Sequence, residues 1–362
     1  MAHVVVVGAG GNIGSHLVPH LGRTPLVSRV TLIDRDRYEP GNLRAQAIDR
    51  GEVGKPKVIV QAGRLRKINP ALEVTTLHRA VEDVPLGLLR ADAIAACLDS
   101  RRARLVVNQA AWRLGVPWIN AGVDGGGLLA RVQAFVPSPD APCLECAWDQ
   151  SDYDAVEQNY PCQVAAGPAP SGAPSSLGAL AAALQAMECD KLLGDDRDNA
   201  LISRDLLVDA RHHRHFVTTF RRNAACRMPD HAGWRINPLD GTAGGITLRD
   251  LFALGSILRG ADEQLTFRVA GQRLVIGLTC LGCGVAQPAL ALERSLRHKA
   301  LTCPHCKGRL RPLGFDLTDA APLSDSHATM DWALSRIGIR MGDVISLVTP
   351  SVDAHYQIGG TP

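Results

Sequence analysis

Cysteines in the last third of the 362-residue chain are spaced as ligands of one metal ion. Cys280 and Cys283 form one Cys-x-x-Cys pair, Cys303 and Cys306 form a second, and nineteen residues separate the pairs. Thiolates in two such turns bind Zn²⁺ tetrahedrally, and a site with four protein ligands is closed to substrate. The sequence therefore predicts a structural zinc ribbon at about 278–312. The alternative is four reduced cysteines in turns.

A glycine-rich stretch near the N-terminus has the composition of a phosphate-binding turn. The apolar run 4–7 leads into it, and a helical pattern begins at Ser15. The glycines of the stretch are Gly8, Gly10, Gly11 and Gly14. Glycine permits positive φ angles and lets backbone amides at a helix N-terminus approach a phosphate. The stretch therefore predicts a nucleotide site, although Ile13 interrupts the strict GxGxxG pattern of dinucleotide dehydrogenases.

Two carboxylates follow strands that should lie beside this turn. Asp34 stands twenty residues beyond Gly14, where a Rossmann-type fold holds a ribose hydroxyl. Asp99 follows the apolar strand expected at 92–98. Because α/β sheets bind ligands at the carboxyl ends of parallel strands, we expect both carboxylates to face the nucleotide.

The elements that must position these residues alternate between strands and helices. Strands are expected at 4–7, 30–34, 73–77, 92–98, 118–120 and 128–136, and helices at 15–21, 57–68 and 177–193. This alternation predicts an α/β fold with a mixed, Rossmann-like sheet. A change of character near 240–245 suggests domains at 1–240, with a crossover loop at about 150–176, and at 241–362. In the second domain we expect helices at 248–258 and 330–339 and strands at 265–269, 272–278 and 344–348.

Composition and charge exclude several classes of function. A net charge of +3 is too small to indicate nucleic acid or a membrane surface as a partner. No apolar run approaches the roughly 18 residues that span a bilayer. The chain opens on a buried strand, which leaves no room for a signal peptide. We therefore expect a soluble, cytoplasmic protein.

The ordered motifs between residues 3 and 231 resemble those of the ubiquitin-activating enzyme superfamily, in particular its ThiF/MoeB-type adenylyltransferases. The resemblance rests on the GAGGNIGS loop, Asp34-x-Asp36, Asn42-Leu43 with Gln46, Lys57, Asn69-Pro70, Asp99 with Arg104, Cys143-x-x-Cys146, Cys162, and a helix carrying Gln185, Glu188 and Lys191. It implies a ThiF-type adenylation fold with helices on both faces of the sheet. It also implies adenylation of the C-terminal carboxylate of a small β-grasp protein by ATP and Mg²⁺.

The resemblance assigns roles to the polar residues of the nucleotide site. Asp34 would hold the ribose, Lys57 would contact the phosphates, and Asp99 would bind Mg²⁺ directly or through water. The full implied set of binding and catalytic residues is Gly8, Gly10, Gly11, Gly14, Asp34, Asp36, Asn42, Arg44, Gln46, Lys57, Asp99 and Cys162. Relatives usually read Asn-Leu-x-Arg-Gln, whereas here Arg44 stands one position early and Ala45 takes the arginine's place. The role of Arg44 therefore stays open.

Many relatives also carry a preceding helix whose arginine reaches the partner subunit's site. This sequence begins almost directly at the first strand, so we expect either another cation to supply that charge or a lower rate. The resemblance implies a homodimer, whose arrangement the sequence leaves open.

A second zinc site is implied by the same resemblance. Cys143 and Cys146 match the first half of a family site whose second half is normally another Cys-x-x-Cys. Here Cys226 matches that half, Pro229 occupies the next ligand position, and His231 is close and chemically suitable. We predict a Cys₃His site of these three cysteines and His231. The alternative is a degenerate site without metal.

Cys162 stands at the start of an Ala/Pro/Gly-rich run that we expect to be a mobile loop. In the family this position takes the activated protein as a thioester or helps in sulfur transfer. A loop thiol that reaches an acyl-adenylate is a suitable nucleophile. The alternatives are an ordinary exposed thiol and a contact with the substrate.

The leading prediction is ATP-dependent adenylation of a ubiquitin-like or sulfur-carrier protein that ends in Gly-Gly, followed by thioester transfer to Cys162. A conjugation pathway would add a conjugating enzyme as a partner. One alternative is sulfur-carrier activation in thiamine or molybdopterin synthesis without a thioester. Two others are an NAD(P)-dependent Rossmann oxidoreductase and an inactive scaffold. The expected cofactors are ATP, Mg²⁺ and Zn²⁺ at two sites.

Overall fold

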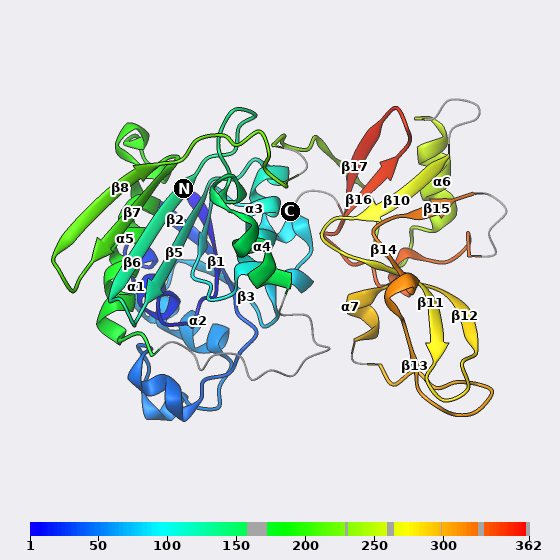
Figure 1. The fold of residues 1–362 in the computed structure, drawn as a ribbon, viewed down its shortest axis with the longest axis horizontal. Coiled ribbons are helices and arrows are strands. Elements are labelled where there is room, and N and C mark those ends of the chain that lie inside the picture. The colour runs from blue at the N-terminus through cyan, green and yellow to red at the C-terminus, as the bar shows by residue number, and fades with distance from the viewer. Residues whose placement is uncertain (158–171, 229–230, 259–263, 298, 325–328, 360–362) are drawn as a thin grey trace. The chain divides into compact units, whose positions relative to one another are not determined.

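The computed structural model divides the chain into two compact units (Figure 1). The residues that it describes are 1–157, 172–228, 231–258, 264–297, 299–324 and 329–359. The first unit comprises 1–84 and 89–233, and the second comprises 85–88 and 234–362. The chain therefore passes from one unit to the other between Gly233 and Trp234, and a short earlier stretch packs with the second unit.

An eight-stranded mixed sheet forms the centre of the first unit, as the sequence predicted. Its strand order is β3-β2-β1-β4-β5-β6-β7-β8. The strands β3, β2, β1, β4 and β5 run parallel to their neighbours, and the pairs from β5 to β8 are antiparallel. Their bounds are β1 (Ala2–Val7), β2 (Val27–Ile33), β3 (Glu73–Leu77), β4 (Ala93–Ala96), β5 (Trp118–Asp124), β6 (Leu129–Phe135), β7 (Arg204–Asp209) and β8 (Arg214–Thr219). The expectation of a Rossmann-like mixed sheet is confirmed.

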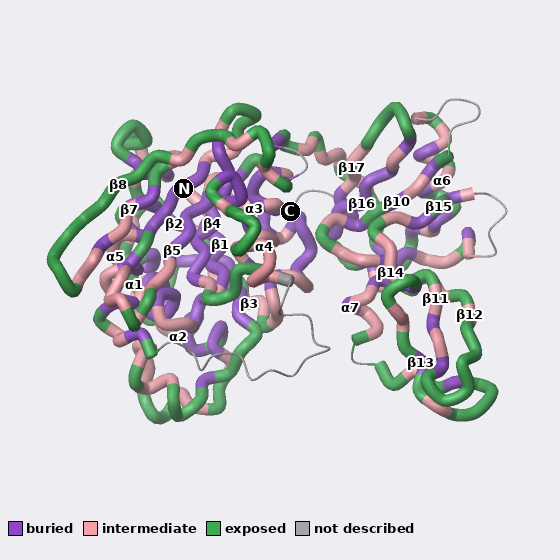
Figure 2. Tube along the Cα trace, in the orientation of Figure 1, coloured by how far each residue is buried: buried purple, intermediate pink, exposed green. Residues whose placement is uncertain are grey.

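Helices cover both faces of this sheet, which explains why its central strands are apolar throughout. The helices are α1 (Gly14–Leu21), α2 (Lys57–Ile68), α3 (Arg101–Leu114), α4 (Gln150–Glu157) and α5 (Ser175–Leu193). Residues of α1, α2 and α5 share one buried apolar cluster with one face of the sheet, and α3 packs on β4 and β5 from the other face. Figure 2 shows the buried trace of the central strands between these layers. Among the described residues, no helix combines the length and the apolar content needed to cross a bilayer.

The second unit contains a five-stranded sheet and a smaller ribbon. The sheet has the order β15-β10-β16-β17-β9, and the ribbon pairs β11 with β12, β13 and β14. The strands are β9 (Ile236–Leu239), β10 (Leu265–Val269), β11 (Leu274–Cys280), β12 (Ala286–Leu292), β13 (Leu310–Arg311), β14 (Leu317–Thr318), β15 (Ala321–Leu323), β16 (Val344–Val348) and β17 (Asp353–Ile358). The ribbon is an insertion, because the chain leaves the five-stranded sheet after β10 and returns to it at β15.

Helix α6 (Leu248–Ser256) belongs to the five-stranded sheet and begins at a capping box. Thr247 accepts from the N–H of Asp250, and the Asp250 side chain accepts from the N–H of Thr247. The prediction of a helix at 330–339 is wrong. Only one 3₁₀ turn forms, η8 (Leu334–Ile337), because the N–H of Leu334 donates to the carbonyl of Ile246 instead of continuing a helix.

Candidate functional site

Glycines shape the turn between β1 and α1 at the carboxyl edge of the parallel strands. Gly8 has a φ of +79°, and a Cβ at this position would clash with the carbonyl of Cys97, which directly follows β4. A Cβ on Gly14 would clash with the carbonyl of Gly8, which accepts from the N–H of Gly11 at 3.2 Å. Because side chains do not fit, the turn presents bare backbone at the edge where α/β sheets bind ligands.

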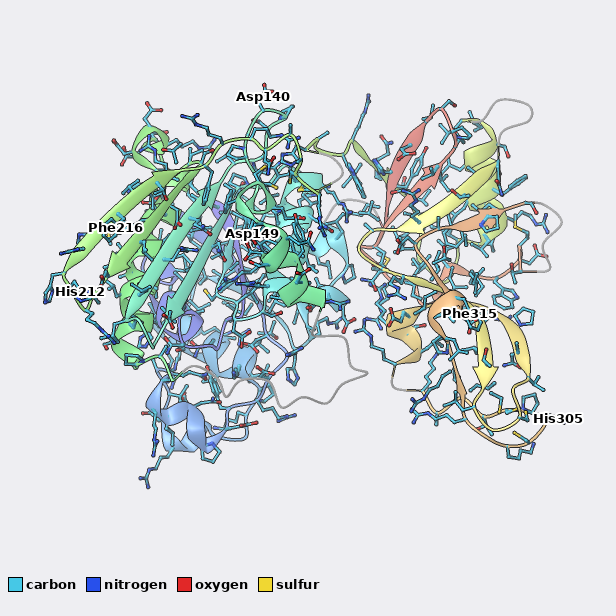
Figure 3. All side chains as sticks on the ribbon, viewed as in Figure 1. Asp140, Asp149, His212, Phe216, His305 and Phe315 are labelled. Atoms are coloured by element: carbon cyan, nitrogen blue, oxygen red, sulfur yellow. The ribbon has the colours of Figure 1, made fainter. Side chains whose placement is uncertain are left out.

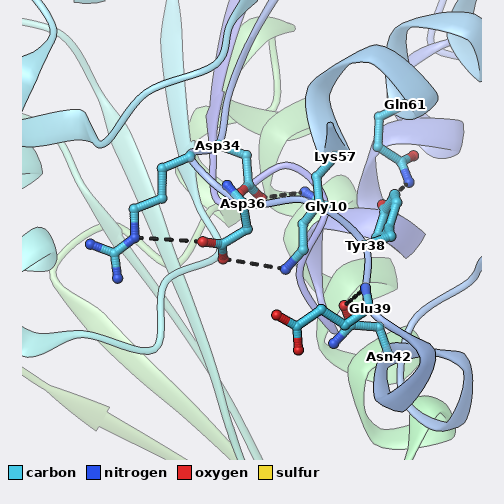
Figure 4. A network of polar contacts seen from close by, with 9 residues as sticks. Gly10, Asp34, Asp36, Tyr38, Glu39, Asn42, Lys57 and Gln61 are labelled. Atoms are coloured by element: carbon cyan, nitrogen blue, oxygen red, sulfur yellow. Dashed lines mark hydrogen bonds and ion pairs between the residues drawn. The ribbon is translucent and has the colours of Figure 1, made fainter. Parts of the chain in front are cut away.

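Asp34 follows β2 and anchors this turn through two hydrogen bonds (Figure 4). Its Oδ2 accepts from the N–H of Gly10 at 2.9 Å, and its Oδ1 accepts from the N–H of Asp36 at 3.0 Å. Only 8% of the residue is exposed, and this burial raises the pKa of Asp34 despite both N–H donors and the nearby Lys57. Each carboxylate oxygen keeps a second lone pair, so Asp34 can also accept from a sugar hydroxyl.

Lys57 is the first residue of α2 and is buried against the glycine turn. Its aliphatic stem occupies the place that a Cβ on Gly10 would take. Its Nζ lies 3.4 Å from Oδ2 of Asp36 and 5.8 Å from the ring centre of Tyr38, whose hydroxyl accepts from Gln61 at 2.7 Å. The ammonium is therefore held beside the bare backbone of the turn, which is a suitable arrangement for binding phosphate.

Asp99 and Arg104 lie at the same edge, after β4. Asp99 is exposed in the loop that precedes α3, and Arg104 is half-buried on that helix, with its Nε enclosed by the protein. The guanidinium donates to the carbonyl of Leu98 at 2.6 Å, and its Nη2 would lie 3.0 Å from a Cβ on Gly122. Burial lowers the pKa of Arg104 to about 10, which leaves it charged at neutral pH. Its Nε has no hydrogen-bond partner among the described residues. The sequence flagged Arg104 only as part of a motif, and the structure adds it to the site.

Gln185 is a second residue to which the sequence gave no role. Its Nε2 donates to the carbonyls of Ala96 and Ile119 at 3.2 and 2.9 Å, and its Oε1 accepts from the Cys97 thiol at 3.2 Å. One fully buried side chain on α5 therefore joins β4 to β5 just before Asp99. Burial raises the pKa of the Cys97 thiol, so this cysteine is a core residue and no nucleophile.

The segment that carries Asn42, Arg44 and Gln46 is separate from the network around Lys57. Asn42 lies in the 3₁₀ turn η1 (Pro40–Arg44), where its Oδ1 accepts from the N–H of Glu39 at 2.8 Å. Arg44 is exposed. Among the described residues, no hydrogen bond or ion pair joins these three side chains to Lys57 or Asp34. The Gln46 side-chain oxygen is buried without a partner among the described residues, which leaves it available to a ligand.

The first cysteine cluster brings together three cysteines and a histidine from distant parts of the first unit. The ligand atoms of Cys143, Cys146, Cys226 and His231 all lie within 4.8 Å of one another. The sulfurs of Cys143 and Cys226 are 3.7 Å apart. A disulfide would require about 2.05 Å, whereas Zn–S bonds of about 2.3 Å in a tetrahedron give about 3.8 Å. The four residues therefore fit a zinc ion.

Helix α3 supports this cluster. The amide oxygen of Asn108 accepts from the N–H of Leu144 at 3.2 Å, and Trp112 packs edge-on against His231 with ring centres 5.7 Å apart. His231 Nδ1 lies 3.2 Å from the carbonyl of Ala141. A hydrogen bond donated by Nδ1 leaves the lone pair on Nε2, which is the tautomer that a metal requires. The same helix therefore carries Arg104 near its start and supports the cluster farther along.

The second cluster joins the two Cys-x-x-Cys turns of the ribbon. Its four thiol sulfurs also lie within 4.8 Å of one another, with Cys280 and Cys306 at 3.4 Å and Cys283 and Cys303 at 3.8 Å. The backbone N–H groups of Cys283 and Gly282 lower the pKa of the Cys280 thiol to about 6, which favours the thiolate. This C-terminal Cys₄ cluster matches the expected zinc ribbon.

Cys162 lies outside the described residues, as does most of the expected crossover loop at 150–176. The first residues of the expected loop are described, and they form helix α4 instead of a loop. Its Tyr153 hydroxyl donates to the Glu145 carboxylate at 3.1 Å, next to Cys146 of the first cluster.

Comparison with known proteins agrees with these features. Residues 1–228 match the ThiF family. The chain is 28% identical over 195 residues to the sulfur carrier protein ThiS adenylyltransferase of Escherichia coli (strain K12), which covers 53% of this chain and 72% of that protein. It is 30% identical over 159 residues to ubiquitin-like modifier-activating enzyme 5 of Oryza sativa subsp. japonica, which covers 40% of this chain and 37% of that protein. The chain therefore spans less than two fifths of the rice relative's length.

Solved structures of E. coli MccB share the fold. The structure of MccB with ATP is 24% identical to this chain, with a TM-score of 0.51, and covers 63% of this chain and 66% of that protein. The structure of MccB with succinimide gives a TM-score of 0.52 over the same share of each chain. By name, the E. coli relative is an adenylyltransferase and the rice relative is an activating enzyme of a ubiquitin-like modifier.

Proposed function

Because the chain belongs to the ThiF family, we propose that it uses ATP to adenylate the C-terminal carboxylate of a small ubiquitin-like or sulfur-carrier protein. The observation that carries this proposal is the buried Lys57, which is held against the bare glycine turn beside Asp34. The names of the relatives in E. coli and rice support it.

In the adenylation step, the protein would stabilise charge and position the substrates, without forming a covalent bond to them. ATP is the second substrate and supplies the electrophilic α-phosphorus. A carboxylate oxygen of the partner protein attacks this phosphorus, and the bond to pyrophosphate breaks. Lys57 and the amides of the glycine turn would neutralise the phosphates, and Asp34 would accept from the ribose. Asp99 would hold Mg²⁺ at the strand edge, and the charge of Arg104 would add to the positive field there.

Other parts of the proposal rest on the family resemblance. The substrate would end in Gly-Gly, and Cys162 would attack the acyl-adenylate to form a thioester with release of AMP. A conjugating enzyme would then accept the activated protein. The chain would act as a homodimer, and sulfur-carrier activation without a thioester is the competing outcome.

Both cysteine clusters are proposed to hold Zn²⁺ in structural roles. The spacing of the sulfurs supports tetrahedral coordination in each, and four protein ligands leave no open position for a substrate. The zinc ions would therefore stabilise the two units without taking part in adenylation.

The test is ATP–pyrophosphate exchange by the purified chain in the presence of a carrier protein that ends in Gly-Gly. Asp99→Asn should lower the exchange rate about 100-fold, because the metal loses an anionic ligand. Asp92→Asn is the matched control, because Asp92 lies at the opposite end of β4 and its side chain accepts from the N–H of His3, as an asparagine also can. This control should exchange at the parent rate.

Two results would contradict the proposal. An Asp99→Asn variant that exchanges as fast as the parent would refute the magnesium assignment. A parent protein that shows neither carrier-dependent exchange nor ATP binding by calorimetry would refute adenylation itself and favour a scaffold.

A further inference from the structure

The ribbon carries an unusual concentration of positive charge. The eighteen residues 294–311 contain six arginines and lysines and no aspartate or glutamate, although the whole chain has a net charge of only +3. These cations are Arg294, Arg297, Lys299, Lys307, Arg309 and Arg311. The segment runs from α7 (Glu293–Leu296) through the second cysteine turn to β13. The adenylation chemistry proposed above uses none of these residues.

Two adjoining hollows gather these cations on the second unit. A hollow of about 460 Å³ is lined by Arg297, Lys299, Lys307 and Arg309. A second of about 450 Å³ is lined by Arg294, Lys299, Arg336 and Arg340. The hollows share Lys299, and no carboxylate lines either of them. Together they form one open basic surface.

Four cations of this surface have no carboxylate partner in the part of the chain that the structure describes. Lys299, Lys307, Arg309 and Arg336 are exposed, and none of the four makes an ion pair among the described residues. Arg294 differs, because it is buried and pairs with the buried Asp343 beneath the surface. One cation therefore supports the floor of the surface, and the others face solvent.

Neutralising the ribbon's own metal does not account for the whole surface. A Zn²⁺ ion with four thiolates has a net charge of −2, which Lys307 and Arg309 beside the second cysteine turn would offset. No ligand cysteine lines either hollow. Arg336 lies in η8 and Arg340 in the loop before β16, so neither belongs to the ribbon. Lys299 and Arg336, which make no ion pair among the described residues, are therefore available to an external anion.

We propose that these two hollows form a docking surface for an acidic segment of a partner protein, one that presents a run of glutamate or aspartate side chains. Exposed aliphatic side chains lie beside the cations. The N–H of Leu281 donates to the carbonyl of Arg309 at 3.1 Å, and the Leu281 side chain is 59% exposed. An acidic segment that also carries aliphatic residues would fit both features.

Protein is favoured over nucleic acid because stacking surfaces are missing from both hollows. Single-stranded nucleic acid binds through base stacking on aromatic rings as well as through phosphate contacts. No aromatic ring lines either hollow, and the guanidinium of Arg336 covers Trp332 at 3.9 Å from the ring centre. Phe315 is exposed but lies toward the base of the ribbon, away from His305 at its tip (Figure 3).

The test measures binding of a fluorescein-labelled peptide of eight glutamates and four leucines to the full chain by fluorescence anisotropy. Lys299→Glu and Arg336→Glu should each weaken binding about tenfold, because each replaces an attraction with a repulsion. Arg268→Glu is the matched control, because Arg268 is exposed on β10 and lines neither hollow. It should bind within about twofold of the parent. Circular dichroism of each variant reports folding, and Lys299→Ala replaces any variant that fails to fold.

Three results would overturn the docking surface. The peptide could fail to bind the parent, or Arg268→Glu could weaken binding as much as Lys299→Glu. The oligonucleotide dT₉, whose eight phosphodiesters match the eight glutamates, could bind more tightly than the peptide at equal salt, which would assign the surface to nucleic acid. The proposal is independent of adenylation, so carrier-dependent pyrophosphate exchange should be the same in Lys299→Glu and the parent.

Discussion

The two cysteine clusters offer similar ligands but are assembled in different ways. In the ribbon, all four cysteines fall within the short segment 280–306. In the first unit, Cys226 and His231 stand some eighty residues beyond Cys143 and Cys146, and helix α3 supports the cluster. Closing a long loop costs entropy that the surrounding fold must offset. We therefore expect the fold of the first unit to position the ligands of its cluster, whereas metal binding stabilises the fold of the ribbon.

The apolar cores around the two clusters differ in size, which supports the same contrast. Near His231, the rings of Trp112, Trp118 and Phe135 form a stacked and edge-on group in the core of the first unit. The ribbon core is small, and its buried members are Val275, Leu278, Cys280, Cys303 and Leu310. Two of these five, Cys280 and Cys303, are proposed zinc ligands. Without zinc the ribbon therefore loses most of what could hold it together.

The largest expected effect is unfolding of the ribbon after loss of one zinc ligand. Cys303→Ser should leave 274–318 unfolded, because the free energy of zinc binding, about 10–16 kcal/mol in small zinc domains, is also their folding energy. Hydrogen exchange of the full chain should show loss of protection in β11 and β13, by about 100-fold or more, with β1 and β5 unchanged. Thr302→Ser is the neighbouring control and should keep parent protection. Parent-like exchange in Cys303→Ser would show that the ribbon folds without its metal.

A smaller effect is expected at the first cluster. His231→Ala should remove its zinc and lower the melting temperature of the first unit by about 5–10 °C, because the sheet and α3 remain to hold the fold. His231→Cys keeps four ligands and should retain the zinc and most of the stability. Calorimetry and metal analysis of both variants measure this. If His231→Ala unfolded the whole first unit, the contrast between the clusters would be wrong.

The smallest effect concerns Asp34, in the first unit but outside its cluster. Burial raises the pKa of Asp34 above its ordinary value of 3.8, so the folded protein binds this proton more readily than the unfolded chain. The contribution of Asp34 to stability should therefore fall as pH rises from about 4 through the raised pKa. Urea midpoints of the parent, relative to Asp34→Asn, should decline between pH 4 and pH 7. A relative midpoint that rises with pH would mean that the fold favours the carboxylate ion.

Sequence predictions succeeded where a feature depends on residues close in the sequence, and one failed where it depends on a distant contact. The ribbon cluster could be predicted because its ligands are close in sequence. The glycine turn could be predicted because its residue types stand at short spacing, and the steric demand at Gly14 comes from the nearby backbone of Gly8 and Ala9. The demand at Gly8 comes instead from the distant carbonyl of Cys97. The helix expected at 330–339 failed because its backbone bonds to Ile246, almost ninety residues away.

In the candidate nucleotide site, too, contacts between distant segments could not be predicted from the sequence. Sequence reasoning listed Asp99 but gave Arg104 and Gln185 no role, because their contacts with Leu98, Ala96 and Ile119 exist only once α3 and α5 pack on the sheet. The sequence grouped Asn42 with the nucleotide residues, which stays a prediction, and the structure adds that its side-chain oxygen accepts from the N–H of Glu39.

By itself, the sequence determined the alternation of strands and helices, the glycine turn and the cysteine pairs, since each depends on residue types at short spacing. The tertiary structure decided which side chains share an edge or a surface. It placed the charge of Arg104 beside Asp99, and it joined cations of the ribbon and of η8 around Lys299. Such groupings come from packing between distant segments, and no local pattern encodes them.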